Sequence, residues 1–216
     1  DKYIKEAAEA SLKRMGTDYI DLYQSHYDDP ETPVSETMAA FNELITAGKV
    51  RYIGASNLSA ERIKESNDFA RENNLAPYIS LQPLYNLYDR QKFENQYLKL
   101  ATEESLAAIP YYSLASGFLT GKYRSEADLS KSLRGKGIKK YLDERGLKIL
   151  TAMDEVAAEQ NVQLSQIAIA WLLQKPTITS AIASATTVKQ LSELARAVNL
   201  KLTDDQMHKL DSASAL

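Results

Sequence analysis

The chain has 216 residues, a net charge of −3, 44% hydrophobic and 25% charged residues, and no cysteine. Its length fits one domain or at most two, and its charge excludes a general basic surface for nucleic acid or for an anionic membrane. The absence of cysteine excludes disulfides, thiolate metal sites and a cysteine nucleophile, and it is compatible with a reducing cytoplasm but neutral about compartment. We expect no metal site and a cytoplasmic location. No apolar run reaches the roughly 18 residues that a membrane helix needs.

Strand-like and helix-like segments alternate along the chain. Residues 2–15 place apolar side chains on one helical face that ends at Gly16, and residues 19–25 form a β-branched and aromatic strand. Further strands are predicted at residues 50–56, 78–83, 107–112 and 178–183. Further helices are predicted from 33 to Gly48, at 60–73, 91–105, 147–160, 163–174 and 188–197, and after 203. The polar stretch 124–146 interrupts this alternation.

Capping signals mark several helix starts. Thr32 is predicted as an N-cap with Pro33 at the first helical position, and Ser59 as the N-cap of the helix that follows it. Residues 187–190 and 203–206 each have the pattern of a capping box, in which a Thr and a Gln satisfy each other's backbone donors.

Every predicted strand ends in polar residues. These residues are Gln24 and His26, Ser56 and Asn57, Gln82, Tyr112 and Ser113, and Ser184 and Thr186. Strands that alternate with helices pair in parallel, and polar groups at each carboxyl end line one mouth of a (β/α) barrel. The absence of a Gly-x-Gly-x-x-Gly pattern argues against a Rossmann domain. We therefore predict an α/β fold of the (β/α)8 TIM-barrel class, as one domain over residues 1–216.

The number of strands is too small for a closed barrel. Five are predicted, whereas such a barrel has eight strands and typically about 250 residues. We therefore expect that the first βα units are absent from this chain and precede residue 1 in a longer protein. The alternative is a genuine fragment, which would leave open sheet edges and which we expect to be unstable or to oligomerise.

His26 is the first candidate for chemistry. It follows the strand at 19–25 directly, and a turn at 28–30 comes next. The carboxyl end of a strand is where ligands and catalytic groups collect in α/β folds. His26 is therefore either a proton or hydrogen-bond partner in catalysis or a structural histidine beside a turn. The other histidine, His208, lies in a polar helical stretch.

Four segments of the chain resemble the aldo-keto reductase family. They are residues 19–26 (YIDLYQSH), 48–57 (GKVRYIGASN), 81–86 (LQPLYN) and 112–123 (YSLASGFLTGKY). The segments occur in the order and at the spacing of the family, and the resemblance covers essentially the whole chain.

The resemblance implies a (β/α)8 barrel that transfers hydride between a nicotinamide cofactor and a small-molecule aldehyde or ketone. It implies that His26 orients the substrate carbonyl and supports proton donation, which suits an imidazole facing a developing alkoxide. Ser56, Asn57 and Gln82 would hold the nicotinamide carboxamide, since these side chains supply both donors and acceptors. Taken alone, the Ser56-Asn57 pair is also typical of a turn after a strand.

The resemblance assigns the rest of the cofactor to the second half of the chain. Tyr112 would stack on the nicotinamide, although an isolated tyrosine here would predict a core position. The residues implied for the pyrophosphate are Ser113, Leu114, Ser116 and Gly117, and those for the adenosine end are Ser184, Thr186, Gln190 and Glu193. Gln190 also has a sufficient structural role in the predicted capping box.

The resemblance leaves the choice between NADP and NAD open. Positions that often carry a cation in NADPH-preferring members hold neutral residues here, and Lys189 is the nearest cation. We predict NADP, with NAD as the alternative. Four basic residues of the polar stretch are candidates for a lid over the cofactor or are simply solvated: Arg134, Lys136, Lys139 and Lys140.

The general acid of the family is a tyrosine that a lysine and an aspartate assist, and all three positions would fall before residue 1. No residue of the present chain takes their place by motif. The predicted function is reduction of an aldehyde or ketone; the alternative is a non-catalytic, cofactor-binding regulatory subunit of the potassium-channel β-subunit type.

Overall fold

The computed structural model describes residues 2–131 and 137–215, which form two compact units. Unit 1 comprises Asp1–Pro83 and Gln96–Ala108, and unit 2 comprises Leu84–Asn95 and Ile109–Leu216.

Unit 1 is built on a parallel sheet. Its strands are β1 (Ile20–Ser25), β2 (Val50–Ser56), β3 (Tyr78–Gln82) and β4 (Ala107–Ala108), and they are adjacent in that order. Because β1, β2 and β3 are in parallel register, Gln24 lies opposite Gly54 and Gly54 opposite Ser80, while Ser56 lies opposite Gln82. The carboxyl ends of these three strands therefore meet at one edge of the sheet.

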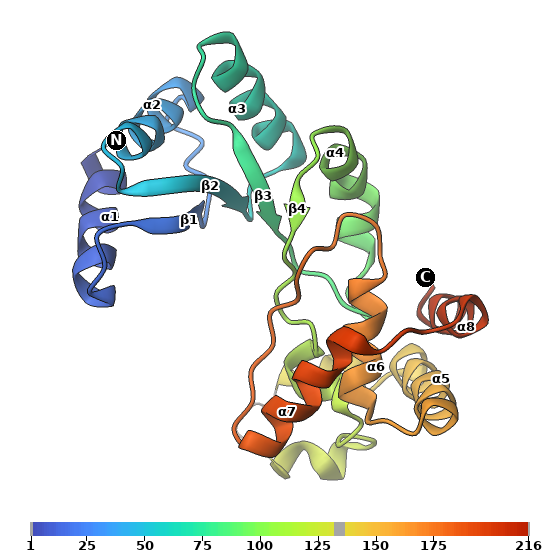
Figure 1. Cartoon of the computed structure of the whole chain (residues 1–216). Coiled ribbons are helices and arrows are strands. Elements are labelled where there is room, and N and C mark those ends of the chain that lie inside the picture. Colours follow the sequence, from blue (N-terminus) through green and yellow to red (C-terminus); the bar gives the residue numbers. More distant parts are fainter. Residues whose placement is uncertain (1, 132–136, 216) are drawn as a thin grey trace. The chain divides into compact units, whose positions relative to one another are not determined.

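Helices α1 (Lys2–Met15), α2 (Val34–Thr46) and α3 (Ala60–Glu72) cover one face of this sheet (Figure 1). Phe41 of α2 is 2% exposed, and its ring meets those of Tyr23 and Tyr78 edge-on, with centroids 5.9 and 6.1 Å apart. Such edge-to-face pairs stabilise a core beyond simple burial. A fourth helix, α4 (Leu98–Glu103), follows a π-helical turn at Phe93–Tyr97.

Gly54 makes room for a polar side chain within the sheet. A Cβ atom at this position would lie 2.1 Å from Oγ of Ser80 and 3.2 Å from Cγ of Gln24. Ser80 is 2% exposed, so its hydroxyl occupies the space that a side chain at Gly54 would fill. Any other residue at this position in β2 therefore requires the Ser80 side chain to move.

A buried amide ties α3 to β3. The Asn67 side chain accepts a hydrogen bond from the backbone N–H of Tyr78 (2.8 Å) and donates one to the Tyr78 carbonyl (3.3 Å). Asn67 also donates to Glu104 (3.2 Å), which accepts a second bond from Arg71 (2.7 Å). The hydrogen bond from Arg71 lowers the pKa of Glu104 from its ordinary value of 4.5, because it stabilises the ionised carboxylate.

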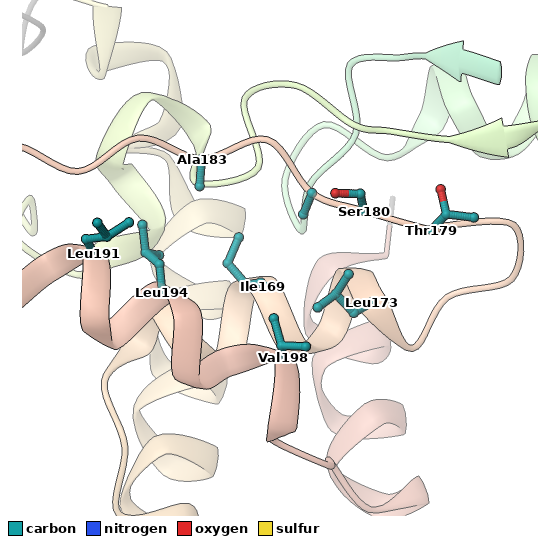
Figure 2. Close-up of a pocket in the computed structure, with 9 residues that line it drawn as sticks. Ile169, Leu173, Thr179, Ser180, Ala183, Leu191, Leu194 and Val198 are labelled. Atoms are coloured by element: carbon teal, nitrogen blue, oxygen red, sulfur yellow. The ribbon is translucent and has the colours of Figure 1, made fainter. Parts of the chain in front are cut away.

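Unit 2 is mainly helical in the residues that the structure describes. Its α-helices are α5 (Glu144–Gln160), α6 (Leu164–Leu173), α7 (Val188–Arg196) and α8 (Asp204–Ser214). Short 3-10 turns occur at Ala115–Thr120, Glu126–Lys131, Lys139–Tyr141 and Ala197–Asn199. α6 is apolar on nearly all sides, which is typical of a helix in a protein interior, and it contains Trp171, which is fully buried. Ile169 and Leu173 of α6 line a small apolar pocket together with Leu194 of α7 (Figure 2).

Trp171 lies in a cluster of charged side chains. Its indole N–H donates to Asp211 of α8 (2.9 Å), and Asp211 also accepts hydrogen bonds from Lys175 (2.7 Å). Arg90 forms an ion pair with the same carboxylate at 3.1 Å. The cluster holds α8 against α6 because one carboxylate collects donors from several segments.

The structure confirms most of the expected elements and corrects others. The strand expected at 178–183 is not formed; the segment is extended, and the backbone N–H of Ile182 donates to the Pro110 carbonyl (2.9 Å). The strand expected at 107–112 is reduced to β4 and a single bridge between Tyr111 and Leu84. Both segments carry residues of regular strands, but neither finds a continuous backbone partner among the described residues.

The expected cap at Thr32 is wrong, whereas that at Ser59 is confirmed. The N-cap of α2 is Pro33, and the Thr32 hydroxyl instead donates to the Asp29 carboxylate (2.7 Å). The Ser59 side chain accepts from the backbone N–H of Arg62. α5 begins at Glu144 rather than at 147, because Asp143 caps it through the backbone N–H of Gly146.

Candidate functional site

Hydrogen bonds join the four residues of unit 1 that the sequence singled out. The Ser56 hydroxyl donates to the Gln82 carbonyl (2.9 Å). The Asn57 amide donates both to Ser56 Oγ (3.0 Å) and to the His26 carbonyl (3.0 Å). Asn57 has a φ of 49°, a left-handed conformation that asparagine tolerates better than most residues. The turn after β2 therefore ties together the ends of β1, β2 and β3.

His26 presents its side chain to solvent at this edge. Its imidazole is exposed and lies 4.2 Å from the Tyr27 ring between centroids, at an angle of 41°. A neutral imidazole has one N–H donor and one acceptor nitrogen, so the group can hydrogen-bond a carbonyl oxygen or transfer a proton.

Unit 2 has a cavity of about 1160 Å³. Every residue of unit 2 that was predicted to contact the cofactor lines this cavity. These lining residues are Tyr112, Ser113, Leu114, Ser116, Gly117, Ser184, Thr186, Gln190 and Glu193. They come from the loop at 112–117, from the extended segment at 182–186 and from α7. The structure thus brings together two groups of residues that are about 70 positions apart in the sequence.

The loop at 112–117 has an unusual backbone. Tyr112, Ala115, Ser116 and Gly117 have φ angles of 54°, 47°, 56° and 99°. Only glycine adopts such angles freely, and each other residue costs on the order of 1–2 kcal/mol. Strain of this kind persists where the surroundings determine the conformation, and it clusters at ligand sites.

The side chains of this loop differ in what they offer to a ligand. Tyr112 is 57% exposed and meets the Tyr111 ring edge-on, with centroids 5.3 Å apart, so its aromatic face is available at the cavity wall. Ser113 is 1% exposed, and its hydroxyl donates to the Pro110 carbonyl (3.2 Å). The Ser113 hydroxyl therefore stabilises the loop.

At the other end of the cavity, the capping box expected for residues 187–190 is only half formed. The Thr187 hydroxyl accepts from the backbone N–H of Gln190 (3.2 Å), as expected. The Gln190 side chain, however, accepts from the N–H (2.9 Å) and hydroxyl (3.0 Å) of Thr186 rather than from Thr187. The bond to Thr186 fixes the bend of the chain just before α7.

The cavity is also lined by polar residues that the sequence did not single out. They are Thr120, Lys122, Gln163 and Ser165. Lys122 is notable because its Nζ lies 3.5 Å from the place that a Cβ at Gly117 would occupy. The Gly-Lys pair at 121–122, within the segment that resembles the family, was the available signal for this cation.

The structure describes only two of the four basic residues that are candidates for a lid. Arg134 and Lys136 lie outside the described residues. Lys139 forms an ion pair with Glu126 (3.0 Å), and Lys140 lies over the Tyr141 ring at 4.5 Å. Neither lysine lines the cavity, although Gly137 does.

Within residues 2–131 and 137–215, no group of three or more His, Asp or Glu side chains is arranged to hold a metal ion. Across the same residues, no helix is both long and apolar enough to cross a membrane.

The sequence profile of the aldo/keto reductase family matches residues 1–215 of this chain. The chain belongs to the aldo/keto reductase family. The fold of this family is a (β/α)8 barrel, and the parallel sheet β1–β4 with its helices has the α/β architecture of that fold.

Curated relatives span the same region. An aldo-keto reductase of Fusarium vanettenii is 33% identical over 214 residues, which are 98% of this chain and 57% of that protein. A probable voltage-gated potassium channel β-subunit of Arabidopsis thaliana is 37% identical over 204 residues, 92% of this chain and 62% of its own. The L-glyceraldehyde 3-phosphate reductase of Escherichia coli K12 is 32% identical over 217 residues, 97% of this chain and 62% of its own. The chain thus spans about three fifths of the length of these relatives.

Proposed function

We propose that this protein is an NAD(P)H-dependent oxidoreductase that reduces an aldehyde or ketone to an alcohol. The observation that supports the proposal most is the cavity of unit 2, whose lining contains all nine residues predicted there from the family resemblance. A bound nicotinamide cofactor would supply the hydride for this reaction. A volume of about 1160 Å³ is large enough for a dinucleotide.

The residues present fit such a cofactor. The exposed face of Tyr112 offers a stacking surface for a planar ring. Gly117 lets a ligand approach the backbone closely, and the Lys122 ammonium beside it suits the negative charge of a pyrophosphate. Ser184, Thr186, Gln190 and Glu193 supply hydroxyl, amide and carboxylate groups for the adenosine end.

The strand ends of unit 1 provide groups for the reacting end. We assign Ser56, Asn57 and Gln82 to the nicotinamide carboxamide, since the amides and the hydroxyl provide both donors and acceptors. We assign His26 as the catalytic group that orients the substrate carbonyl and donates a hydrogen bond as negative charge develops on its oxygen. Preorganisation of the turn at 56–57 by its hydrogen bonds to β1 and β3 supports this assignment.

NADP is the proposed cofactor, and NAD is the alternative. Lys122 is the only cationic side chain among the described residues that line the cavity. A 2′-phosphate at the adenosine end would be held by hydroxyl and amide groups together with the amino-terminal end of α7, which favours anions. Comparing the dissociation constants of NADPH and NADH decides between the two.

A second candidate function is that of a cofactor-binding β-subunit of a potassium channel. It is favoured by the relatives from Arabidopsis thaliana and Oryza sativa, both named as probable channel β-subunits and 37% and 35% identical. Turnover of aldehydes or ketones with NADPH supports the reductase. Cofactor binding without turnover, together with a stable complex with a partner protein, supports the subunit.

Calorimetric titration with NADPH tests the cofactor assignment. We expect NADPH to bind the wild-type chain saturably. We expect Lys122→Ala to bind NADPH about tenfold more weakly, because the loss of one charged contact costs about 1.4 kcal/mol of binding free energy. The matched control is Lys139→Ala, which removes a lysine paired with Glu126 that does not line the cavity. Absence of NADPH binding, or equal losses in the two variants, would contradict the proposal.

A further inference from the structure

Asn86 is a fully buried amide whose hydrogen-bonding capacity is used completely. Its Nδ2 donates to the Tyr112 carbonyl (3.0 Å) and to Asp89 Oδ2 (3.1 Å). Its Oδ1 accepts from the backbone N–H groups of Tyr88 (2.9 Å) and Asp89 (2.8 Å). The residue is 0% exposed and all four of its hydrogen-bonding positions are satisfied. No other residue type has two donors and one acceptor oxygen on a side chain of this length.

Tyr112 needs such support because its backbone is strained. Its φ of 54° lies in the left-handed region, which is unfavourable for every residue type that carries a Cβ atom. Its carbonyl oxygen accepts two hydrogen bonds, one from the N–H of Ala115 (2.7 Å) within the loop and one from Asn86. The Asn86 bond is the one that anchors the turn to a segment 26 residues earlier in the chain. Because the backbone angles set the direction of the Cα–Cβ bond, this anchor also sets the direction of the Tyr112 ring.

Asp89 connects this anchor to a second segment. The carboxylate that accepts from Asn86 also accepts from the Tyr141 hydroxyl (2.9 Å). Burial and the nearby Asp89 carboxylate raise the pKa of Tyr141, so the hydroxyl stays protonated and remains a donor. The Tyr141 ring is 1% exposed and stacks on Phe118, which follows the loop at 112–117, with centroids 5.3 Å apart. The network therefore contacts the loop from two directions.

We propose that Asn86 is a positioning residue for the nicotinamide half of the cofactor, acting through the Tyr112 turn, with Asp89 and Tyr141 holding its amide in place. This inference rests on the proposed function, because it takes Tyr112 as the nicotinamide-stacking residue. Beyond that function, the inference makes nicotinamide binding depend on the Nδ2 donors of Asn86. Loss of the Nδ2 donors is expected to weaken binding of the nicotinamide half. Binding of the adenosine end should stay unchanged, because other segments of the cavity bind it.

Asn86→Asp is the sharpest substitution for a test. It keeps the shape of the side chain and the oxygen that accepts from Tyr88 and Asp89, but it replaces both donors with an oxygen. The new carboxylate faces the Tyr112 carbonyl and the Asp89 carboxylate, so the anchor becomes repulsive. The matched control is Asn161→Asp, which introduces the same charge at an exposed left-handed position in unit 2.

Two ligands separate positioning from general folding: NADPH, and 2′-phospho-ADP-ribose, which lacks the nicotinamide. We expect Asn86→Asp to bind NADPH at least tenfold more weakly and 2′-phospho-ADP-ribose within twofold of the wild type in calorimetric titration. Asn161→Asp is expected to bind both as the wild type does. Equal weakening toward both ligands, or no weakening toward either, overturns the proposal.

Tyr141→Phe covers the case in which Asn86→Asp does not fold. It removes one hydroxyl and keeps the ring on Phe118, and we expect about threefold weaker NADPH binding with unchanged binding of 2′-phospho-ADP-ribose. An unselective effect in this variant also overturns the proposal. If the wild-type chain binds neither ligand, the proposed function itself fails, and that outcome is distinct from an unselective effect of the variants.

Discussion

The strand ends of unit 1 and the cavity loop of unit 2 position their polar residues in different ways. In unit 1, the register of three parallel strands brings the ends of β1, β2 and β3 to one edge, and a single turn joins them. In unit 2, a loop with four left-handed residues is held by a buried amide from a distant segment. Regular strands carry their own backbone partners, whereas the loop depends on side chains elsewhere in the unit. The two regions should therefore respond differently to substitution.

The largest expected effects come from two glycines, Gly54 in β2 of unit 1 and Gly146 in α5 of unit 2. A Cβ at Gly146 would lie 1.8 Å from the Tyr141 backbone oxygen, whereas a Cβ at Gly54 would lie 2.1 Å from the Ser80 hydroxyl. We expect Gly146→Ala to lower the free energy of unfolding by about 3 kcal/mol and Gly54→Ala by about 2 kcal/mol, measured by urea denaturation.

A second substitution should rescue only the variant of unit 1. Ser80→Ala removes the atom that a Cβ at Gly54 would strike, so most of the loss in Gly54→Ala is expected to be recovered. No side-chain change at Tyr141 removes its backbone oxygen. Gly137→Ala, where a Cβ would meet nothing within 4 Å, is the control and should change stability by less than about 0.5 kcal/mol. Rescue of Gly146→Ala by Tyr141→Phe would contradict this contrast.

An intermediate effect is expected at Glu104 in unit 1. Because the pKa of Glu104 is lowered in the folded chain from its ordinary value of 4.5, its stabilisation is fully present above about pH 4.5. The stabilisation is lost as the pH falls through the lowered pKa. We expect Glu104→Gln to cost about 1 kcal/mol at pH 7 and almost nothing in strong acid, by urea denaturation across pH.

The neighbouring Glu103→Gln is the control for this pH dependence. Glu103 is exposed and lies 3.8 Å from Lys99, so its replacement should change stability little at any pH. A difference between wild type and Glu104→Gln that stays constant from pH 7 to pH 3 would be inconsistent with the role assigned to its carboxylate.

Two substitutions of equal or smaller effect distinguish a true helix cap from an apparent one. Ser59→Ala removes the side chain that accepts from the Arg62 N–H and should cost about 1 kcal/mol. Thr32→Ala removes only a hydroxyl that donates to Asp29 in an exposed turn, and it should cost less than about 0.5 kcal/mol. Thermal unfolding of both variants measures this difference, and equal losses would restore Thr32 as a cap.

The sequence predicted unit 1 more completely than unit 2. Strands β1 to β3 and the cap at Ser59 depend on local patterns, and their residues match those patterns. Thr32 was misassigned because Pro33 fits both the first helical position and the N-cap, and the sequence offers the Thr32 hydroxyl a competing acceptor in Asp29. In unit 2, the segment at 178–183 has the composition of a strand but no continuous backbone partner among the described residues.

The cavity residues could be predicted only through the family resemblance, and their support could not be predicted at all. The hydrogen bond from Asn86 spans 26 residues, and that from Tyr141 to Asp89 spans 52. Periodicity and capping rules reach only a few positions along the chain, so they contain no information about such contacts. Asn86 lies inside a segment that resembles the family, yet nothing local indicated that its amide is buried.

Trp171 has a practical consequence for any study of the molecule. It is the only tryptophan in the sequence, it is fully buried in α6, and its indole N–H is bound to Asp211 of α8. Intrinsic emission excited at the red edge of the absorption band therefore reports on unit 2 alone. Detachment of α8 would bring water to the indole and shift this emission to longer wavelength, which gives a label-free signal for one half of the chain.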